Sequence, residues 1–527
     1  MARTPLFDAL RRAARLAALC ENKGISTEEG IERVAETHET QWTRRRFLSA
    51  TAGAVVSGML SPLLLPRLAR GATTPRIVIV GAGCAGLTCA YRLQQRHVPT
   101  QVLEAGTRVG GRMFSLRNTF PDDQVVELGG ELIDSGHRSI RRLARELGLT
   151  LVDLRKGADH LHEVFYFDNR QVPLSEIVAS FRPVAQRILK DLATLKGEGP
   201  VTYRSTRRAH ALDQMSITEW CEKREVAGVL RAILEHAYCS EFGLETDEQS
   251  ALNLLHMIGT TPGSFVMFGE SDERFHIAEG NDSIPLRLAE RLARPVELET
   301  RLEAIRQQAN GGYTLTVNQR GTVRDIAADT VVITLPFTLL RQVDLSGVEL
   351  PDVKRLAIRT IGYGTNAKLM TGFTRRVWHE TNGNGSTLTD LPYHVSWDTS
   401  RGQQGTHGVL TNFTGGKRGL TLGEGTPEER AAHLVSALDA IFPGAAAAHT
   451  KQSARFHWPS SPLALGSYAC YKPGQYTTIA GAEREAVGGL HFAGEHTSFD
   501  SQGFMNGASE SGERVAREIV RRGISRK

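Results

Sequence analysis

The sequence predicts an α/β fold that contains a doubly wound, Rossmann-like parallel sheet. The first observation is a β-branched run at residues 77–80 that leads directly into a GxGxxG pattern at 81–86. The second is the helix-compatible segment 87–95, and the third is a short strand-like run that ends in Glu104, roughly 20 residues after the first glycine. A lone glycine pattern is weak evidence. The strand, the glycines, the helix and the distant acid together predict a dinucleotide-binding βαβ unit.

Each position of this motif has a physical role. Gly81 permits the tight turn, Gly83 lets the backbone approach a pyrophosphate, and Gly86 lets the helix pack closely on the strand. The N-terminus of the helix, near Ala85, offers free N–H groups and a partial positive charge to phosphates. Glu104 can accept hydrogen bonds from both hydroxyls of a ribose.

Length and charge narrow the class of protein. A chain of 527 residues with 40% hydrophobic residues predicts two or three domains with a sizeable core. Residues 1–72 carry 11 Lys and Arg against 7 Asp and Glu, so most of the net charge of +5 lies there and the rest is nearly neutral. We therefore expect no nucleic-acid partner. The six cysteines contain no CxxC pair and the histidines form no ligand pattern, so we expect no disulfide framework and no metal site.

Further motifs extend the βαβ unit. The segment Glu-Ala-Gly-Thr-Arg-Val-Gly-Gly-Arg at 104–112 adds a second glycine pair and an arginine. Glu-Leu-Gly-Gly-Glu follows at 127–131, Leu-His-Phe-Ala-Gly-Glu-His-Thr at 490–497 and Gln-Gly-Phe-Met-Asn-Gly-Ala at 502–508. In this order the blocks resemble the flavin amine oxidase superfamily over about residues 75–522. The Gly-Gly-Glu-Leu form resembles exported bacterial oxidases of L-arginine and related L-amino acids.

The resemblance implies that FAD is the cofactor. Positions that match the cofactor-binding motifs of the family occur in all four blocks, and one more lies between them. They are Gly81, Gly83, Ala85, Gly86, Glu104, Ala105, Gly111, Arg112, Gly129, Gly130, Glu131, Val296, Gly494, Glu495, Gly503, Phe504 and Met505. At Val296 the resemblance implies a backbone contact with the adenine.

The resemblance also implies a discontinuous Rossmann-like FAD domain with an inserted substrate domain of mixed α+β structure. We expect the FAD domain at 73–135, 272–345 and 484–522, and the substrate domain at 136–271 and 346–483. Hydrophobic periodicity predicts helices and strands within these pieces. Helices are expected at 139–147 and 184–195, strands at 295–298, 329–336, 363–373 and 409–413, and a glycine-rich turn at 382–385.

One lysine and three aromatic residues match the chemistry-bearing positions of the family. Lys368 matches the lysine held near flavin N5, usually through a water; otherwise it is a surface residue of a strand. Tyr468 and Phe504 match the aromatic pair that flanks the substrate, and Trp458 matches a further aromatic. Two ring faces can guide a neutral amine and exclude water, although core packing is the alternative for each.

Residues next to Tyr468 bear on how FAD is attached. Relatives with covalent FAD carry a cysteine immediately before the first aromatic residue. Here Ser467 occupies that position, and Cys470 lies three residues beyond it. We therefore expect non-covalent FAD.

The substrate class rests on conflicting signals. Residues 384–392 follow Lys368 at the spacing of L-amino acid oxidases, which favours an amino acid. The carboxylate-binding arginine of those enzymes is missing at 129–132, and Trp397 stands near the expected aromatic hydroxyl. Glu131 and Asp398 would suit a cationic, arginine-like side chain; their alternative roles are bonding to backbone near the flavin and surface exposure.

The expected reaction is oxidation of an L-amino acid to a 2-oxo acid and ammonia, with hydride transfer to flavin N5. Oxygen, giving hydrogen peroxide, or a quinone would reoxidise the cofactor. The alternatives are a monoamine or polyamine oxidase without a carboxylate site, a membrane-associated dehydrogenase that feeds quinones, and a non-catalytic flavin-binding protein. We expect a homo-oligomer, a dimer.

The N-terminal 72 residues resemble a leader. Thr-Arg-Arg-Arg-Phe-Leu at 43–48 precedes an apolar stretch at 50–65 and small residues at 69–72, as in twin-arginine export signals. The protein is therefore expected to be periplasmic or extracellular, or membrane-associated if the segment is retained. The alternative is a basic helix end before a buried apolar helix. An amphipathic segment, Leu6 to Leu19, is either a retained helix or part of a solvated leader.

Overall fold

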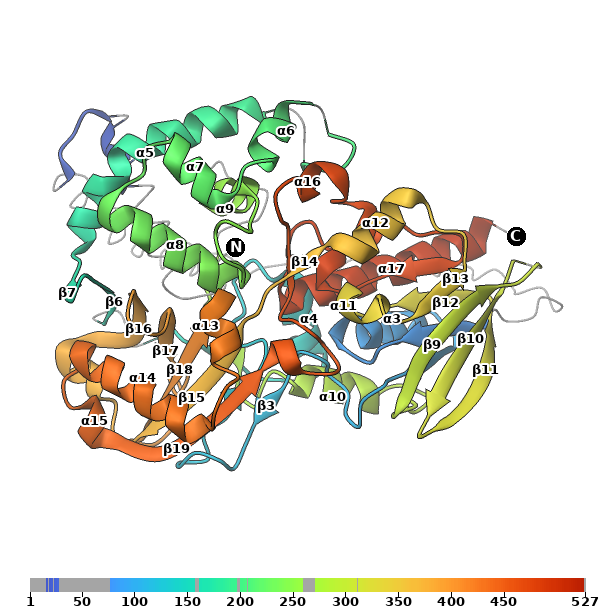
Figure 1. Ribbon diagram of the computed structural model, residues 1–527. Helices are drawn as coiled ribbons and strands as arrows, with labels where there is room; N and C mark the ends of the chain where they lie inside the picture. Colours follow the sequence, from blue (N-terminus) through green and yellow to red (C-terminus); the bar gives the residue numbers. More distant parts are fainter. Residues whose placement is uncertain are drawn as a thin grey trace, which may run out of the picture.

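The structure is a computed structural model that describes most of the chain from residue 76 onward (Figure 1). The described ranges are 16–17, 19–21, 23–27, 76–156, 161–196, 200–205, 207–258, 271–309 and 311–525. The predicted export signal and most of the predicted helix Leu6 to Leu19 lie outside these ranges. Within the described part of that helix, Leu16 and Ala17 are helical and buried.

A four-stranded parallel sheet forms the centre of the dinucleotide-binding part. Its strands, in spatial order, are β2 (Thr100–Leu103), β1 (Ile77–Val80), β12 (Thr330–Ile333) and β21 (Leu490–Phe492). Every residue of β1 is buried, as expected of a β-branched strand covered on both faces. The long C-terminal helix α17 (Met505–Ser525) packs along α3 (Cys84–Gln94). The predicted Rossmann-like fold is confirmed.

A second, seven-stranded sheet forms the other large part of the molecule (Figure 1). Its order is β19 (His449–His457), β15 (Ala367–Phe373), β18 (Gly408–Thr414), β17 (Val395–Asp398), β16 (Gly383–Thr389), β6 (His162–Phe167) and β7 (Arg170–Gln171). Helix α14 (Pro427–Ile441) packs on β15 and β19, and the short helices α13 (Gly416–Thr421) and α15 (Ala445–Ala448) lie nearby. This mixed architecture agrees with the expected α+β part.

Helices form the upper part of the view in Figure 1. They are α5 (Leu174–Thr194), α6 (Arg207–Asp213), α7 (Ile217–Lys223), α8 (Gly228–Phe242) and α9 (Ala251–Met257). Helix α8 also contacts strands β6, β16 and β18, so it joins the helical group to the seven-stranded sheet. No helix in the described ranges is both long and apolar enough to cross a membrane.

Smaller elements complete the structure. A second four-stranded sheet has the order β11 (Thr322–Ala328), β10 (Tyr313–Gln319), β9 (Thr300–Gln307) and β13 (Asp344–Gly347). Three strand pairs are β3 (Ser115–Leu116) with β4 (Val126–Glu127), β5 (Leu151–Asp153) with β8 (Phe275–Ile277), and β14 (Gly362–Tyr363) with β20 (Ala469–Cys470). The remaining helices and turns are α4 (Arg138–Glu146), α10 (Ser283–Glu290), α11 (Phe337–Leu340), α12 (Asp352–Thr360), α16 (Gln475–Thr478), η1 (Val377–Thr381), η2 (Trp458–Ser460), η3 (Ala482–Arg484) and η4 (Glu495–Thr497).

The structure differs from the sequence-based expectation at three places. The predicted strand 295–298 is reduced to a single bridge between Glu297 and Leu103. The predicted turn 382–385 contains the start of β16, where a Cβ on Gly383 would lie 2.8 Å from the ring of Phe442, so glycine serves close packing there. Helix α4 packs against α17 and β5 pairs with β8, so the dinucleotide-binding part extends past the expected boundary at residue 135.

Candidate functional site

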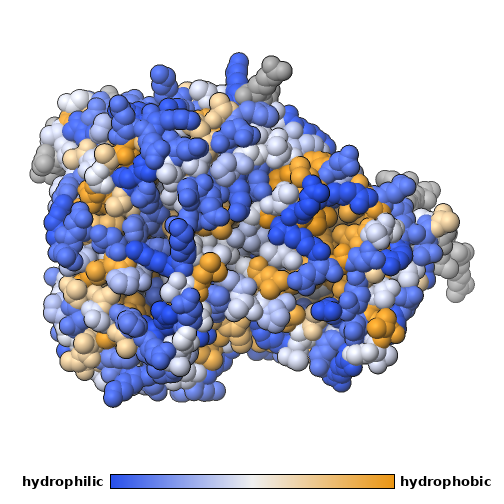
Figure 2. All heavy atoms as spheres, in the orientation of Figure 1, coloured by the Kyte–Doolittle hydropathy of each residue, from blue (hydrophilic) through white to orange (hydrophobic). Residues whose placement is uncertain are grey.

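One large cavity runs between the two main parts of the molecule. Its volume is about 550 Å³, and it extends from the turn after β1 to the side chains of β15 and β17. Near α11 its wall is apolar and includes Leu335, Leu339 and Val343. Figure 2 shows hydrophobic residues gathered on this face over the region where α11 and α12 lie in Figure 1.

The GxGxxG turn forms one end of the cavity. Gly81 has a φ of 102°, a conformation that favours glycine. A Cβ on Gly83 would meet nothing within 4 Å, so the backbone there is open to a ligand. A Cβ on Gly86 would lie 2.0 Å from the carbonyl oxygen of Gly81, so this glycine allows the close helix–strand packing that the motif predicts. Gly86 itself is not among the residues that line the cavity.

The predicted ribose acid lies at the same end. The carboxylate of Glu104 accepts hydrogen bonds from the backbone N–H groups of Ala82 and Gly106, each at 2.8 Å. These bonds hold the side chain at the cavity wall beside Ala105. The helix α3 begins at Cys84 without a side-chain cap, so its first turn presents backbone N–H groups toward the cavity.

An arginine and a glutamate bring the first and last pieces of the chain together. Arg112 donates hydrogen bonds to the carboxylate of Glu495 at 2.9 Å and to the carbonyl of Ser467 at 2.6 Å. The other carboxylate oxygen of Glu495 accepts the N–H of Gly503 at 2.8 Å. Arg112, Glu495 and Gly503 all line the cavity, so the positions inferred from distant motifs form one wall.

Two glycines allow a close approach of backbone in the middle of this wall. A Cβ on Gly129 would lie 1.9 Å from the carbonyl oxygen of Arg112, and a Cβ on Gly130 would lie 2.7 Å from the side chain of Met505. A side chain at either position would therefore clash with the wall itself. Both glycines and Met505 line the cavity, as do Gly111 and Gly494.

Lys368 of β15 lies at the far end of the cavity. Its ammonium donates to the carbonyls of Glu127 and Gly129 at 3.0 and 2.8 Å and to the carboxylate of Glu131 at 2.7 Å. These three bonds use all the hydrogens of an ammonium group. The role expected for Lys368 beside flavin N5 stays a prediction.

Aromatic side chains line the cavity together with Lys368. Trp397, Phe413, Phe456, Trp458, Tyr468 and Phe504 all line the cavity. The hydroxyl of Tyr468 donates to the carbonyl of Glu241 at 2.8 Å, and the indole of Trp458 donates to the carbonyl of Leu128 at 3.0 Å. Both polar tips are thus satisfied, and the ring faces remain available as an apolar wall.

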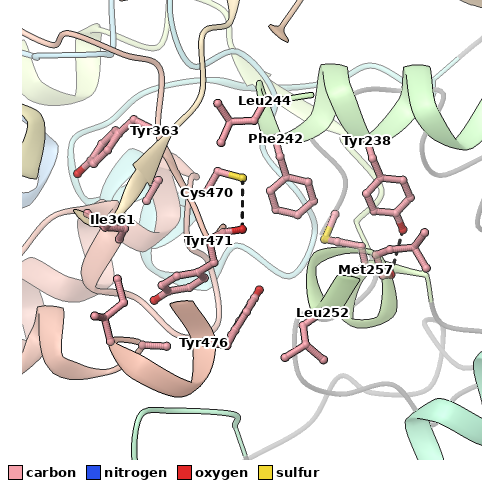
Figure 3. Close-up of a cluster of buried hydrophobic side chains, with 14 of the residues drawn as sticks. Tyr238, Phe242, Leu244, Leu252, Met257, Ile361, Tyr363, Cys470, Tyr471 and Tyr476 are labelled. Carbon is pink, nitrogen blue, oxygen red and sulfur yellow. Dashed lines mark hydrogen bonds between the residues drawn. The ribbon is translucent and has the colours of Figure 1, made fainter. Parts of the chain in front are cut away.

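A second, smaller hollow of about 40 Å³ lies behind Phe504, which lines both spaces. Its other lining residues include His256, Met257, Tyr471 and Tyr476. Figure 3 shows Tyr471 and Tyr476 facing each other in this region, with ring centroids 4.4 Å apart. Phe504 therefore separates the main cavity from a tightly packed aromatic cluster.

Asp398 and Val296 do not line the cavity. Successive residues of a strand face opposite sides, and Trp397 of β17 faces the cavity, so Asp398 faces away. Its carboxylate accepts from the indole of Trp378 at 3.1 Å and lies 3.8 Å from Arg376. The predicted contact of Asp398 with a cationic substrate is therefore wrong. At the position expected for Val296, the cavity is lined by Thr300 and neighbouring residues of β9.

Glu131 lines the cavity, but both of its carboxylate oxygens are already bound. One oxygen binds Lys368, and the other accepts from the indole of Trp397 at 2.8 Å and from the hydroxyl of Thr399. The protein thus engages both oxygens of this carboxylate. Since Asp398 faces away, Glu131 is the one of the two expected acids that lines the cavity.

The structure adds lining residues that the motifs did not indicate. Asn366 lies between β14 and β15, and Ser467 directly precedes Tyr468. The hydroxyl of Ser467 donates to the side chain of Asn366 at 2.7 Å, so this bond connects the two segments. Glu273 also lines the cavity and has a φ of 41°. Only the proximity of Asn366 to Lys368 in the sequence could have indicated a role for it.

Burial shifts the pKa of several acids and bases around the cavity. Burial raises the pKa of Glu127 to about 7, although the N–H of Asn281 and the hydroxyl of Ser115 both donate to its carboxylate. His496 follows Glu495, and burial holds its pKa well below the ordinary value. A neutral His496 adds no further positive charge beside Arg112.

The residues present fit a flavin dinucleotide. The open backbone at Gly83, the first turn of α3 and Glu104 suit a pyrophosphate and a ribose. The wall from Gly129 to Lys368 provides a glycine-lined space in the same cavity as the aromatic residues. The same cavity therefore combines a dinucleotide cradle with an apolar chamber.

Comparison with known proteins settles the family. The sequence pattern of the family described as flavin containing amine oxidoreductase matches residues 84–520. The chain belongs to the flavin-containing amine oxidoreductase family. Membership implies an oxidoreductase with a flavin cofactor, which agrees with the cradle just described.

Individual relatives of this flavin amine oxidase are distant. An L-amino-acid oxidase of Siganus canaliculatus is 26% identical over 467 residues, which are 85% of this chain and 85% of that protein. The human flavin-containing amine oxidase B is 25% identical over 464 residues, or 84% of this chain and 86% of that protein. The relatives therefore include oxidases of both substrate classes at similar identity.

Solved structures show the same fold. Cyclohexylamine oxidase from Brevibacterium oxydans superposes with a TM-score of 0.74 at 21% identity, covering 85% of this chain and 99% of that one. Wild-type putrescine oxidase bound to putrescine superposes with a TM-score of 0.73 at 20% identity and the same coverage. At this identity the likeness establishes the architecture alone.

Proposed function

We propose that the protein is an FAD-dependent amine oxidase whose substrate carries its amine on a carbon without a carboxylate. When bound, FAD supplies the acceptor for the hydride removed from that carbon. The resulting imine hydrolyses to a carbonyl compound and ammonia, and oxygen reoxidises the cofactor with release of hydrogen peroxide. The observation that carries this proposal is the aromatic chamber around Lys368, in one cavity with the dinucleotide cradle.

The side chains of the protein orient the substrate and exclude water from the reacting carbon. The rings of Tyr468, Phe504 and Trp397 bound the chamber and exclude water from the reacting carbon. No free carboxylate of Glu131 competes for the amine, because its oxygens are bound. An amine that enters this apolar space is favoured in its neutral form, because desolvation disfavours the ammonium.

The absence of a free cation argues against an α-carboxylate. The described residues that line the cavity include four cations, namely Arg108, Arg112, Arg301 and Lys368. Each has a protein partner: backbone carbonyls for Arg108, Glu495 for Arg112, Glu303 for Arg301 and Glu131 for Lys368. A substrate carboxylate would therefore have to compete with these partners for a cation, which makes its burial against this wall costly.

Non-covalent attachment of FAD forms part of the proposal. Ser467 has no thiol to form a thioether, and its hydroxyl is bound to Asn366. Cys470 is buried in β20 and is not among the residues that line the cavity. Acid precipitation tests this proposal: the yellow colour should remain in the supernatant, and colour in the protein pellet would contradict it.

An L-amino acid is the second candidate substrate class. It is favoured by the L-amino-acid oxidase among the relatives and by the spacing of residues 384–392 after Lys368. However, most of this block lies in β16, and none of its residues lines the cavity. The block therefore supports the sheet and gives no direct support for a carboxylate site.

Matched pairs of substrates separate the two classes. Anaerobic protein is mixed with phenylethylamine or phenylalanine, with isoamylamine or leucine, and with agmatine or arginine, and loss of flavin colour is followed. We expect bleaching by the amines and little by the corresponding amino acids. The reverse pattern would establish the amino acid oxidase, and peroxide yield in air would distinguish an oxidase from a quinone-linked dehydrogenase.

Export by the twin-arginine route is proposed from the sequence at 43–72 alone. That route carries folded proteins, which suits an enzyme that binds its flavin before export. The test is fractionation of cells that express the wild type or a variant with Arg44 and Arg45 replaced by lysine.

A homodimer is proposed in addition. Light scattering of the purified protein measures its mass in solution.

A further inference from the structure

A buried ion pair lies in the wall of the cavity that also contains the dinucleotide cradle and the aromatic residues. Lys368 of β15 and Glu131 approach to 2.7 Å, with side chains only 5% and 6% exposed. Both residues line the cavity. Two opposite charges at this distance in a dry site form a neutral unit, because neither is screened by water.

The carboxylate of Glu131 is held on both sides. Its second oxygen accepts from the indole N–H of Trp397 at 2.8 Å and from the hydroxyl of Thr399. Trp397 also lies under the ammonium, with Lys368 Nζ 5.2 Å from the ring centroid. Glu131 thus both contacts the lysine and accepts a hydrogen bond from the indole of Trp397.

The backbone around Glu131 is fixed as well. The side-chain amide of Asn281 donates to the carbonyls of Gly130 and Glu131 at 2.9 and 2.6 Å. The backbone N–H of Asn281 donates to the carboxylate of Glu127 at 2.8 Å. The carboxylate of Glu131 therefore cannot swing toward the cavity without breaking several bonds.

We propose that Glu131 is a positioning residue that holds Lys368 as a fixed, neutralised cation and thereby sets the redox potential of the flavin. The inference requires a flavin in this cavity, but it does not depend on which amine is oxidised. Lys368, with its three N–H groups held by protein acceptors, acts on the flavin through its charge.

The charges of the pair predict opposite effects for its two members. Replacement of Glu131 by glutamine leaves the ammonium without its counter-charge, and a net positive charge near the flavin favours the anionic reduced form. Replacement of Lys368 by methionine leaves a net negative charge, which disfavours that form. Removal of both charges restores a neutral site.

The test is a reductive titration of the bound flavin against a reference dye, with no amine present. We compare the wild type, Glu131→Gln, Lys368→Met and the double variant over a range of pH. We expect Glu131→Gln to raise the midpoint potential, because the ammonium of Lys368 then lacks its counter-charge. Lys368→Met should lower it, and the double variant should return close to the wild type.

Other titrating groups face the pair and remain in all four proteins. They are Glu127 of β4, His276 of β8 and Glu273, so their contributions are common to the comparison. Thermal unfolding provides a second readout, because each single variant leaves a buried charge unpaired. The double variant should unfold at a higher temperature than the sum of the single effects predicts.

Asp398→Asn is the matched control. It removes a buried carboxylate from the same strand as Trp397, but on the face turned away from the cavity. It should leave the potential unchanged. Equal potentials for Glu131→Gln and the wild type at every pH, or shifts of the same sign in both single variants, would overturn the proposal. If Glu131→Gln changed the unfolding temperature but not the midpoint potential, Glu131 would stabilise the fold without acting on the flavin, and the proposal would be wrong.

Discussion

Arg112 and Glu495 lie 383 residues apart in the chain, yet the guanidinium donates to the carboxylate at 2.9 Å in the wall of the cavity. The carboxylate is nearly buried, while the arginine is a quarter exposed toward the cavity. The pair therefore joins the glycine-rich loop after β2 to the turn after β21.

Arg112→Ala should lower both flavin content and stability. It leaves Glu495 buried without its cation, which costs about 3–5 kcal/mol when a buried pair is broken. The ratio of flavin to protein absorbance and the thermal unfolding midpoint measure the two effects. Arg306→Ala, which breaks the exposed pair with Asp344, should cost less than about 1 kcal/mol and keep full flavin content. Similar losses in both variants would contradict a special role for the buried pair.

Gly129→Ala should prevent normal packing of the cavity wall. The added methyl would lie 1.9 Å from the carbonyl oxygen of Arg112, and backbone cannot yield as a flexible side chain can. We expect a loss of about 1–3 kcal/mol or more in the free energy of unfolding, with poor flavin retention. Gly136→Ala, where an added Cβ would meet nothing within 4 Å, is the control and should behave like the wild type.

Phe504→Ala should slow anaerobic flavin reduction by roughly 10- to 100-fold, because misplacement of the reacting carbon is costly. The ring separates the main cavity from the hollow behind it, so its loss lets a substrate shift away from the flavin. Tyr468→Phe keeps the ring and loses only the bond to Glu241, worth about 1 kcal/mol of stability. Its reduction rate should stay within a few-fold of the wild type, as measured by stopped-flow absorbance.

Glu127 should make stability decrease with pH. Burial raises its pKa in the folded state from 4.5 to about 7, so the folded protein binds more protons than the unfolded chain between these values. The resulting stabilisation is complete below pH 4.5 and is lost as the pH rises to about 7. Glu127→Gln lacks this dependence. The stability difference between wild type and variant should change by about 3 kcal/mol across the window; a constant difference would contradict the shift.

Asp398→Asn should affect arginine and leucine equally, if either is a substrate. The carboxylate faces Trp378 and Arg376 on the side of β17 turned away from the cavity. Steady-state kinetics with both amino acids checks this. A selective loss with arginine would mean that the side chain reaches the substrate after all.

Motifs that contact a ligand through the backbone could be located from the sequence. The glycines at 81, 129 and 130 are required by a turn or by close approaches that other residues cannot make, and Gly83 leaves the backbone open to a ligand. Such a pattern can be recognised from the local sequence. Lys368 could also be located, because the strand that carries it was predicted from the sequence and places it at the cavity. Cofactor positions spread over the whole chain thus converge on one wall.

Side-chain roles were harder to predict, for physical reasons. Trp397 and Asp398 are neighbours on a strand and cannot both face the cavity, but that exclusion needs the strand to be known. The roles of Glu131 and Lys368 depend on a contact across 237 residues of chain, which no local pattern contains. The glycines at 383 and 385 signalled a turn, although tertiary packing places them in β16.

The order of strands in the parallel sheet has a consequence for how the protein is made. Strand β21 and helix α17 complete the sheet and the cavity, and both lie near the C-terminus. At about 5–20 residues per second, a ribosome takes about 20–80 seconds to synthesise the segment between Arg112 and Glu495. The strands β1 and β2 and the helix α3 therefore keep apolar surface uncovered until synthesis is almost finished. A nascent chain that stops before residue 490 lacks β21 and α17, so it has neither the complete sheet nor the complete wall of the cavity.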